Sequence, residues 1–226
     1  GVVPNLLQTG AGSPTGITIY EGKLLPKEFH GQMLHCDAGP NVCRAYPVEN
    51  DGAGYKAQTV NIMSSSNDRW YRPSDVTVAP DGSLMIADWY DPGVGGHGMG
   101  DLERGRVFRV APKGKSAYQI AKLDTSTTEG AIAALKSPNN ATRYLGWTAL
   151  SQSNGGRQAA RKLFRDKQAD PRHRARGLQL LGWHKKASVR AALKDRDPNI
   201  RIAGLRLARQ HNSHLLESIA MLVEDK

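Results

Sequence analysis

The sequence has little of what marks membrane-spanning proteins and the common motif-bearing enzymes. No run of 18 apolar residues is present, so no stretch is predicted to cross a membrane. HExxH, GxSxG and CxxCH are also missing, which excludes the corresponding zinc-protease, α/β-hydrolase and haem-attachment motifs. The Gly-rich stretches 93–100 and 114–116 lack the strand–loop–helix context of nucleotide-binding loops. Evidence of function must therefore come from the architecture.

The first residues lack the basic region and the continuous apolar core of a signal peptide. The chain begins Gly1-Val2-Val3 without Met. We therefore expect it to be a segment of a longer protein whose earlier part lies upstream. On that interpretation, the missing signal peptide says nothing about export.

Acidic residues are scarce in the second half of the chain. The whole sequence has 31 Lys and Arg against 21 Asp and Glu, a net charge of +10. Residues 1–112 hold 9 basic and 12 acidic residues, a net of −3, whereas residues 113–226 hold 22 and 9, a net of +13. This change predicts a β domain at 1–112, a linker at 113–130 and a helical domain at 131–226.

The stretch Trp70–Pro112 predicts three short antiparallel strands, at Asp75–Ala79, Ser83–Ala87 and Arg106–Val110. Pro80-Asp81-Gly82 has the chemistry of a tight turn between the first two. Residues 13–48 repeat the pattern: Pro14–Ile19 aligns with Pro73–Val78, Gly31–Asp37 with Gly82–Asp88, and Val42–Ala45 with Val107–Val110. Repeated units of this kind indicate blades of a β-propeller. Propellers close with four to eight blades, so two blades predict a partial propeller with further blades upstream. The alternative is a small two-sheet sandwich.

Cys36 and Cys43 fall in the second and third predicted strands of the first repeat. If residues 38–41 form the intervening turn, the two cysteines face each other on antiparallel strands. A disulfide between them would indicate an oxidising compartment. The alternative, which we favour, is a pair of buried free thiols that pack as small hydrophobic side chains.

The second half predicts a HEAT-type α-solenoid. Ser126–Glu129 has capping-box spacing ahead of a helix at Ala131–Lys136. A Pro followed seven residues later by Leu recurs at Pro138, Pro171 and Pro198, with Asp170 and Asp197 as N-caps of the last two helices. Helix pairs recurring at this interval are typical of a solenoid. The Arg positions follow the repeat, which favours bonds within the fold. The expected partners of these Arg side chains are neighbouring helix carbonyls or Asp side chains such as Asp170 and Asp197. The alternative is that the basic region binds an acidic partner, a protein rather than nucleic acid.

One end of the second β repeat gathers polar residues. In an antiparallel blade, the start of the first strand and the loop after the second strand lie at the same end. The predicted substrate or cofactor face comprises Arg72, Asp75, Asp88, His97 and Arg104, and the candidate metal ligands are Asp88 and Asp91. In the alternative interpretation, Asp88 only caps its own turn and His97 is solvated.

Four segments resemble the membrane-bound dehydrogenase family: His35–Asn41 (HCDAGPN), Arg72–Pro92, Gly105–Val110 and Leu135–Leu150. Family members join a six-bladed propeller, similar to sorbosone and glucose dehydrogenases, to HEAT repeats and often to a c-type haem domain. The resemblance implies a periplasmic or secreted protein, with any membrane association made through parts outside this chain. It also implies pyrroloquinoline quinone and Ca²⁺ over the propeller channel, and haem c in a C-terminal domain outside this chain. The family's catalytic base lies in an earlier blade, so that role is not carried over to His97 and no catalytic residue is assigned.

Three functions fit these observations. The first is a segment of a dehydrogenase-like propeller protein that oxidises a sugar or alcohol and passes electrons to haem, the segment alone being inactive because its channel is not closed. The second is a non-catalytic scaffold that binds a glycan or a protein. The third is a Ca²⁺-dependent propeller hydrolase of the lactonase type.

Overall fold

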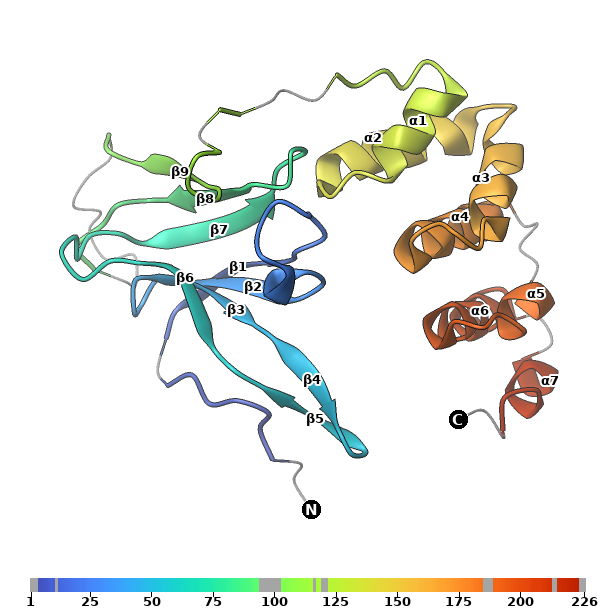
Figure 1. Ribbon diagram of the computed structural model, residues 1–226, viewed down its shortest axis with the longest axis horizontal. Coiled ribbons are helices and arrows are strands. Elements are labelled where there is room, and N and C mark those ends of the chain that lie inside the picture. The colour runs from blue at the N-terminus through green and yellow to red at the C-terminus, as the bar shows by residue number, and fades with distance from the viewer. Residues whose placement is uncertain are drawn as a thin grey trace. The chain divides into compact units, whose positions relative to one another are not determined.

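A computed structural model of the chain describes residues 4–10, 12–93, 103–115, 117–118, 122–184, 189–212 and 215–223. The chain divides into two compact units. The β unit comprises Gly1–Ala121 with Pro138–Asn140, and the helical unit comprises Lys122–Ser137 and Ala141–Lys226 (Figure 1). The predicted order of strands followed by helices is confirmed. The β unit extends beyond Pro112, where the change in charge placed its end.

The first sheet of the β unit has four antiparallel strands in the order β1-β2-β3-β6. Their bounds are Pro14–Ile19 for β1, Met33–Asp37 for β2, Val42–Tyr46 for β3 and Val60–Ser64 for β6. A short 3₁₀ helix, η1 (Lys27–Phe29), lies between β1 and β2, and the hairpin of β4 (Val48–Asp51) and β5 (Gly54–Ala57) lies between β3 and β6. Every residue of β4 is exposed. This hairpin was not predicted because it lacks the apolar alternation of a half-buried strand.

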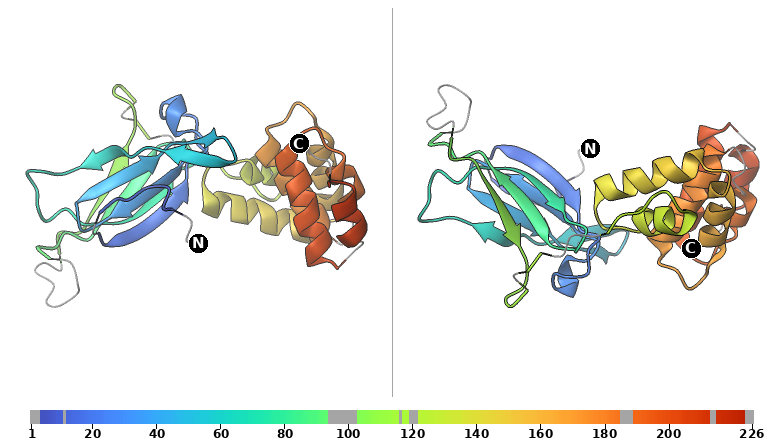
Figure 2. Two further views of the ribbon diagram at one scale, coloured as in Figure 1. Left: turned by 90° about the horizontal axis from the view of Figure 1, so that it is seen from below. Right: turned by 90° about the horizontal axis from the view of Figure 1, so that it is seen from above.

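The second sheet has three antiparallel strands in the order β7-β8-β9 (Figure 2). They are β7 (Pro73–Val78), β8 (Leu84–Asp88) and β9 (Arg106–Val110). The sequence predicted these three strands to within two residues. Gly82, in the turn between β7 and β8, has a φ of +87°, a conformation that glycine adopts without strain.

The two sheets are structural repeats whose first and second strands match in register as the sequence alignment predicted. The third strands align one residue earlier than predicted, because Asp37 pairs with Val42 whereas Asp88 pairs with Arg106 and not Val107. The cross-strand pairs at equivalent positions are Ile17–His35 and Ile19–Met33 in the first sheet, and Val76–Ile86 and Val78–Leu84 in the second. Each first strand also has an irregularity in register near its start, between Pro14 and Ile17 in β1 and between Pro73 and Asp75 in β7.

The repeat extends to the hydrogen bonds of two aspartates. Asp37 ends β2 and its Oδ1 accepts from the backbone N–H of Ser13 at 2.7 Å. Asp88 ends β8 and its Oδ1 accepts from the backbone N–H of Arg72 at 2.7 Å. Both donors directly precede the first strand of their sheet. Each buried carboxylate therefore ties the start of one strand to the end of the next.

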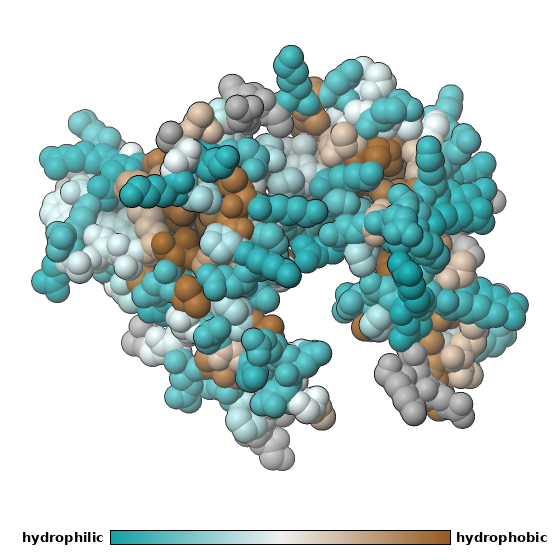
Figure 3. Space-filling view, viewed as in Figure 1, coloured by the Kyte–Doolittle hydropathy of each residue, from teal (hydrophilic) through white to brown (hydrophobic). Residues whose placement is uncertain are grey.

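The sheets stack face on face around one apolar core. The first sheet supplies Leu34, Cys36, Cys43 and Ala45, and the second supplies Val76, Val78, Leu84 and Ile86. At one edge, β1 and β7 come very close, because a Cβ added to Gly16 would lie 2.5 Å from the Cα of Asp75. Only glycine permits that approach. In Figure 3, apolar side chains gather on the β unit, whereas the visible surface of the helical unit is mostly hydrophilic.

Tyr20 links the loop after β1 to the turn of the second sheet. Its hydroxyl donates to the carbonyl of Gly82 at 2.7 Å and accepts from the N–H of Leu25 at 2.8 Å. The side chain is fully buried, and burial raises the pKa of Tyr20, so the hydroxyl remains a donor at neutral pH.

We expect Tyr20→Phe to lower the free energy of unfolding of the β unit by about 1–3 kcal/mol, because two buried backbone groups lose their partner. The matched control is Tyr55→Phe, at a side chain 65% exposed on β5, which should change it by less than about 0.5 kcal/mol. Chemical denaturation measures both, and equal stability of the two variants would contradict the prediction.

The described helices are α1 (Thr128–Leu135), α2 (Asn140–Gln152), α3 (Gly156–Arg165), α4 (Pro171–Trp183), α5 (Val189–Leu193), α6 (Pro198–Gln210) and α7 (Leu215–Ala220). Asp170 and Asp197 accept from backbone N–H groups at the N-termini of α4 and α6, so both predicted N-caps are confirmed. The N-cap of α1 is Thr127, one residue after the predicted Ser126. None of the helices in the described ranges is long and apolar enough to span a membrane.

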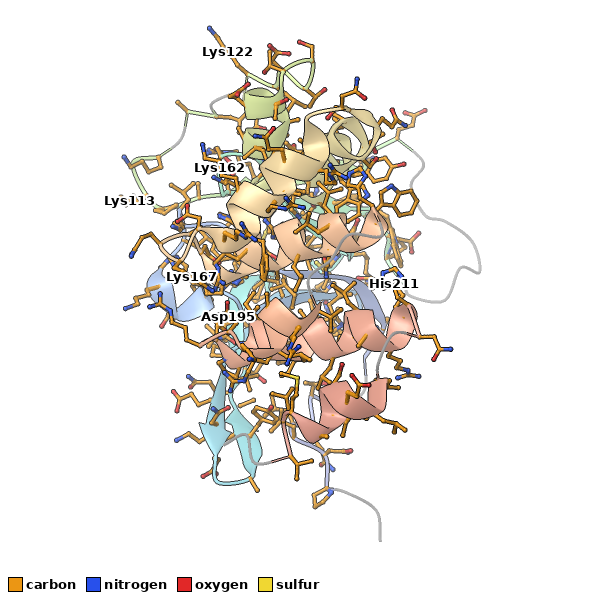
Figure 4. All side chains as sticks on the ribbon, turned by 90° about the vertical axis from the view of Figure 1, so that its right-hand side faces the viewer. Lys113, Lys122, Lys162, Lys167, Asp195 and His211 are labelled. Carbon is orange, nitrogen blue, oxygen red and sulfur yellow. The ribbon has the colours of Figure 1, made fainter. Side chains whose placement is uncertain are left out.

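A buried ion cluster joins α4 to the turn between α5 and α6. Arg174 is 2% exposed and forms two hydrogen bonds to the carboxylate of Asp195, whose side chain is fully buried. Lys167 pairs with the same carboxylate at 2.5 Å (Figure 4). The guanidinium also donates to the carbonyl of Phe164 at 3.1 Å. The repeat arginines Arg143, Arg174, Arg176 and Arg201 therefore bond within the fold, as their spacing predicted. The acidic partner is Asp195 rather than Asp170 or Asp197.

Candidate functional site

Asp88 accepts several hydrogen bonds at the end of the second sheet where the sequence predicts a substrate or cofactor face. Its Oδ1 accepts from the N–H groups of Arg72 and Tyr90, at 2.7 and 3.0 Å. Its Oδ2 accepts a hydrogen bond from Nε of Arg106 at 2.8 Å, and Nη2 of the same guanidinium lies 2.6 Å from Oδ2 in the ion pair. The alternative that Asp88 caps its own turn is thus correct in part. The carboxylate also fixes β9 through Arg106.

Arg72 connects the two sheets at this end. The side chain is 8% exposed, and its guanidinium donates to backbone carbonyls. On the first sheet these are the carbonyls of Ala38 at 2.9 Å and Gly39 at 3.3 Å, and on the loop after β8 those of Asp91 and Pro92, both at 3.0 Å. All three guanidinium nitrogens are therefore used within the β unit, which makes Arg72 a structural clamp.

An open surface lies beside this clamp. Arg106 bridges Asp88 to Asp68, whose Oδ2 lies 2.9 Å from Nη1, and its guanidinium carbon lies 4.1 Å from the centre of the Tyr90 ring. The ring of Trp70, 37% exposed, lies 5.5 Å from that of Tyr90. Tyr90 has a φ of +55°, which is unusual for a residue with a large side chain and is held here by the surrounding contacts. We call Asp68, Trp70, Tyr90 and Arg106 the aromatic–arginine surface.

The structure places the other predicted site residues in different environments. Asp75 is exposed near the start of β7, beside Gly16, and its Oδ1 accepts from the N–H of Val76. Arg104 is exposed ahead of β9. Asp91 is 7% exposed, and its Oδ1 accepts from the N–H of Gly93 at 2.8 Å. His97 lies outside the described residues.

The predicted metal ligands do not form a cation site in the part of the chain that the structure describes. No group of three or more His, Cys, Asp or Glu side chains there could hold a metal ion. Asp88 is surrounded by N–H donors and by the guanidinium of Arg106. These groups stabilise the Asp88 carboxylate and repel a metal cation. The described residues of this site therefore do not fit Ca²⁺.

Cys36 and Cys43 face each other across β2 and β3, as the turn at 38–41 predicted. Both are free thiols and fully buried. A hydrogen bond with Cys43, together with burial, raises the pKa of Cys36 well above its ordinary value. The Cys36 thiol therefore stays protonated, and burial makes both thiols slow to react.

We expect two free thiols per chain when the protein is purified without reductant and then denatured. In the native state, a thiol reagent should react at least about tenfold more slowly, because the β unit must open first. Quantitative thiol titration tests both points. A count of zero after denaturation would instead establish the disulfide.

The sequence analysis did not identify any of the four members of the aromatic–arginine surface, Asp68, Trp70, Tyr90 and Arg106, as site residues. The sequence did contain a signal for two of them. Trp70 and Tyr90 lie on either side of the first two strands of the second repeat, and the first repeat has no aromatic residue at the equivalent positions. The two aromatic rings lie side by side because backbone hydrogen bonds join residues 70–72 to residues 89–91. The N–H of Asp91 donates to the carbonyl of Trp70 at 2.9 Å, and that of Trp89 to the carbonyl of Arg72 at 3.1 Å.

Residues 7–114 match the family described as a domain of unknown function (DUF7133). The match lies within the β unit. Neither the curated proteins nor the solved structures gave a match to this chain.

Proposed function

We propose that the chain is a segment of a dehydrogenase-like propeller protein, and that its β unit binds a sugar or alcohol on the aromatic–arginine surface. The observation that carries the proposal is an exposed Trp70 beside Tyr90, with the carboxylate of Asp68 and the guanidinium of Arg106 at the same place. The apolar face of a sugar ring packs on an aromatic ring, and its hydroxyls bond to charged groups at the edge.

The proposal includes the propeller as the fold of the β unit. Support comes from the repeated register of the two sheets and from the repeated aspartate bonds of Asp37 and Asp88. It also includes a HEAT-type solenoid for the helical unit, supported by the recurrence of Pro at the starts of α4 and α6. Oxidation of the bound sugar or alcohol, with pyrroloquinoline quinone, Ca²⁺ and haem c, belongs to parts of the protein outside this chain. A periplasmic or secreted location follows from that chemistry.

The binding step is tested by calorimetric titration of the chain with a panel of monosaccharides, disaccharides and polyols. Trp70→Ala should weaken binding of any sugar that binds by at least about tenfold, because the stacking surface is lost. Trp183→Ala is the matched control, since that exposed side chain belongs to the helical unit. Absence of binding across the panel, or equal binding by both variants, would overturn the proposal.

The oxidation step requires a separate assay. The chain alone should reduce no dye with sugars, pyrroloquinoline quinone and Ca²⁺, whereas a longer protein that contains the missing parts should. A longer protein without activity under any of these conditions would leave sugar binding as the function.

A non-catalytic scaffold is the second candidate. It is favoured by the engagement of Arg72 and Asp88 within the fold, because neither side chain is available to take part in chemistry. The basic helical unit would then dock an acidic protein. Capture of the same acidic protein by the helical unit, together with no oxidation by the complete protein, would favour this candidate.

A further inference from the structure

The helical unit has an open hollow of about 480 Å³ between α1 and α3. Its lining includes Thr128, Ile132 and Lys136 from α1 and its C-cap, and Ala159, Lys162 and Leu163 from α3. Residues at these spacings lie on one face of a helix, so each helix contributes one face to the hollow. We call the hollow the α1–α3 groove and define it by these six residues.

The floor of the α1–α3 groove is apolar. Ile132 and Ala159 are partly buried and pack against the core of the helical unit, and Leu163 belongs to that core. Removing the exposed part of these side chains from water is favourable. An apolar floor between two helices is suited to receive the apolar face of a third helix, which would pack its side chains between theirs.

Positive charge surrounds this floor. Lys136 and Lys162, the second of which is labelled in Figure 4, are both exposed. α3 also exposes Arg157, Arg161 and Arg165, and it has no Asp or Glu between its bounds. None of these five cations forms an ion pair with the residues that the structure describes. Their unmatched charge attracts an acidic partner.

Two carboxylates also line the hollow, and the fold stabilises the charge of each. Asp166 directly follows α3, and its Oδ1 accepts from the N–H of Gln168 at 3.0 Å. Glu129 lies in the first turn of α1, where the helix dipole favours a negative charge. Lys136 and Lys162 lie at the other ends of their helices, in the cap of α1 and the last turn of α3. These lysines are therefore the groups that remain to pair with a bound acidic side chain.

We propose that the α1–α3 groove docks an amphipathic helix of an acidic protein, with aliphatic side chains on the apolar floor and carboxylates beside Lys136 and Lys162. The apolar contact supplies most of the affinity, because exposed ion pairs contribute little free energy. The charges select the partner. The proposal assigns a binding site to the acidic protein of the scaffold candidate and rests on that candidate. It does not depend on sugar binding.

The test measures binding of designed helical peptides to the full chain by fluorescence anisotropy. The probe is a labelled peptide of about 18 residues, with Leu along one face and Glu and Ala on the other. One control peptide has Lys in place of Glu, and a second has Gln in place of Leu at unchanged charge. The Leu/Glu peptide should bind at least about tenfold more tightly than either control, because each control lacks one of the two contacts.

A pair of charge-reversed variants tests where the peptide binds. Lys136→Glu with Lys162→Glu should weaken binding of the Leu/Glu peptide at least about tenfold. The matched control is Arg206→Glu with Arg209→Glu, at exposed residues of α6, which changes the net charge by the same amount. It should weaken binding by less than about twofold, because an interaction with distant exposed charges is screened by salt.

A second pair of variants tests the hollow itself without changing the charge. Ala159→Trp places a large side chain in the α1–α3 groove and should also weaken binding at least about tenfold. Ala191→Trp, at an exposed residue of α5, should leave binding unchanged. Circular dichroism establishes that all the variants are folded.

Several outcomes would overturn the proposal. Equal weakening by the two charge-reversed variants would show general attraction to the basic helical unit, which excludes the groove but leaves the scaffold candidate standing. Equal binding of the Gln peptide would exclude the apolar floor. Binding of phosphatidylglycerol vesicles without binding of the Leu/Glu peptide would assign the basic surface to a membrane. A doubled mass that Ala159→Trp returns to one chain would assign the groove to a second copy. The aromatic–arginine surface is untouched in every variant, so failure of sugar binding is read separately.

Discussion

Replacing Asp195 with alanine should lower the free energy of unfolding of the helical unit by about 3–5 kcal/mol. The variant leaves the guanidinium of Arg174, only 2% exposed, without its carboxylate partner. It also removes the acceptor of the N–H of Asp197 and the partner of Lys167. Loss of the helical circular dichroism signal in denaturant measures the effect.

Asp197→Ala is the matched control, two residues away. Asp197 has the same charge and caps α6 by accepting from the N–H of Asn199 at 2.8 Å, so its loss should cost about 1 kcal/mol. Equal costs for the two variants would show that the buried pair contributes no more than a helix cap.

The same carboxylate gives the helical unit a pH dependence. Burial opposes ionisation of Asp195, but hydrogen bonds from Arg174 and Lys167 outweigh it, so the pKa of Asp195 is held well below its usual range. A depressed folded-state pKa contributes stability above the unfolded value, near 4, and that contribution is lost as the pH falls toward the folded value. The difference between the native chain and Asp195→Ala should therefore be constant near neutral pH and shrink below about pH 4.

Replacing Arg72 with alanine should destabilise the β unit by about 3–5 kcal/mol. Four backbone carbonyls on two sheets lose a charged donor, and a hydrogen bond to a charged group contributes about 1.5–3 kcal/mol before the remaining groups relax. Chemical denaturation followed by tryptophan fluorescence measures the effect in a chain that carries Trp147→Phe and Trp183→Phe, so that the signal comes from Trp70 and Trp89 of the β unit.

The control is Arg104→Ala, at an exposed residue of the loop after β8, which should change stability by less than about 0.5 kcal/mol. The pair of variants also separates two roles for Arg72. A clamp predicts lost stability, with sugar binding unchanged once the protein is folded. A stable Arg72→Ala variant that no longer binds sugar would show that Arg72 belongs to the binding face instead.

The strands of both repeats could be predicted because apolar alternation and turn residues lie close together in the sequence. The same information predicted that Cys36 would face Cys43, since a four-residue turn fixes the register of a hairpin. The hairpin of β4 and β5 could not be found in this way, because exposed strands have no apolar period. The side chains that meet in the aromatic–arginine surface also depend on backbone bonds between distant residues, which no local pattern encodes.

The role of Arg72 shows a further limit of sequence interpretation. A charged residue near a Gly-rich loop is a reasonable candidate for a ligand contact. The sequence contains no sign that four carbonyls, on two sheets, converge on its guanidinium. Backbone carbonyls are present at every residue, so their convergence is a property of the fold alone.

The hydrogen bonds that join the two sheets do not involve a thiol. Arg72 and Tyr20 cross from one sheet to the other through hydrogen bonds, whereas Cys36 and Cys43 lie within one sheet, on strands that are already paired. Oxidising or reducing the thiols would therefore leave the hydrogen bonds of Arg72 and Tyr20 between the sheets in place, whereas the packing around both sulfurs in the core between the sheets would change.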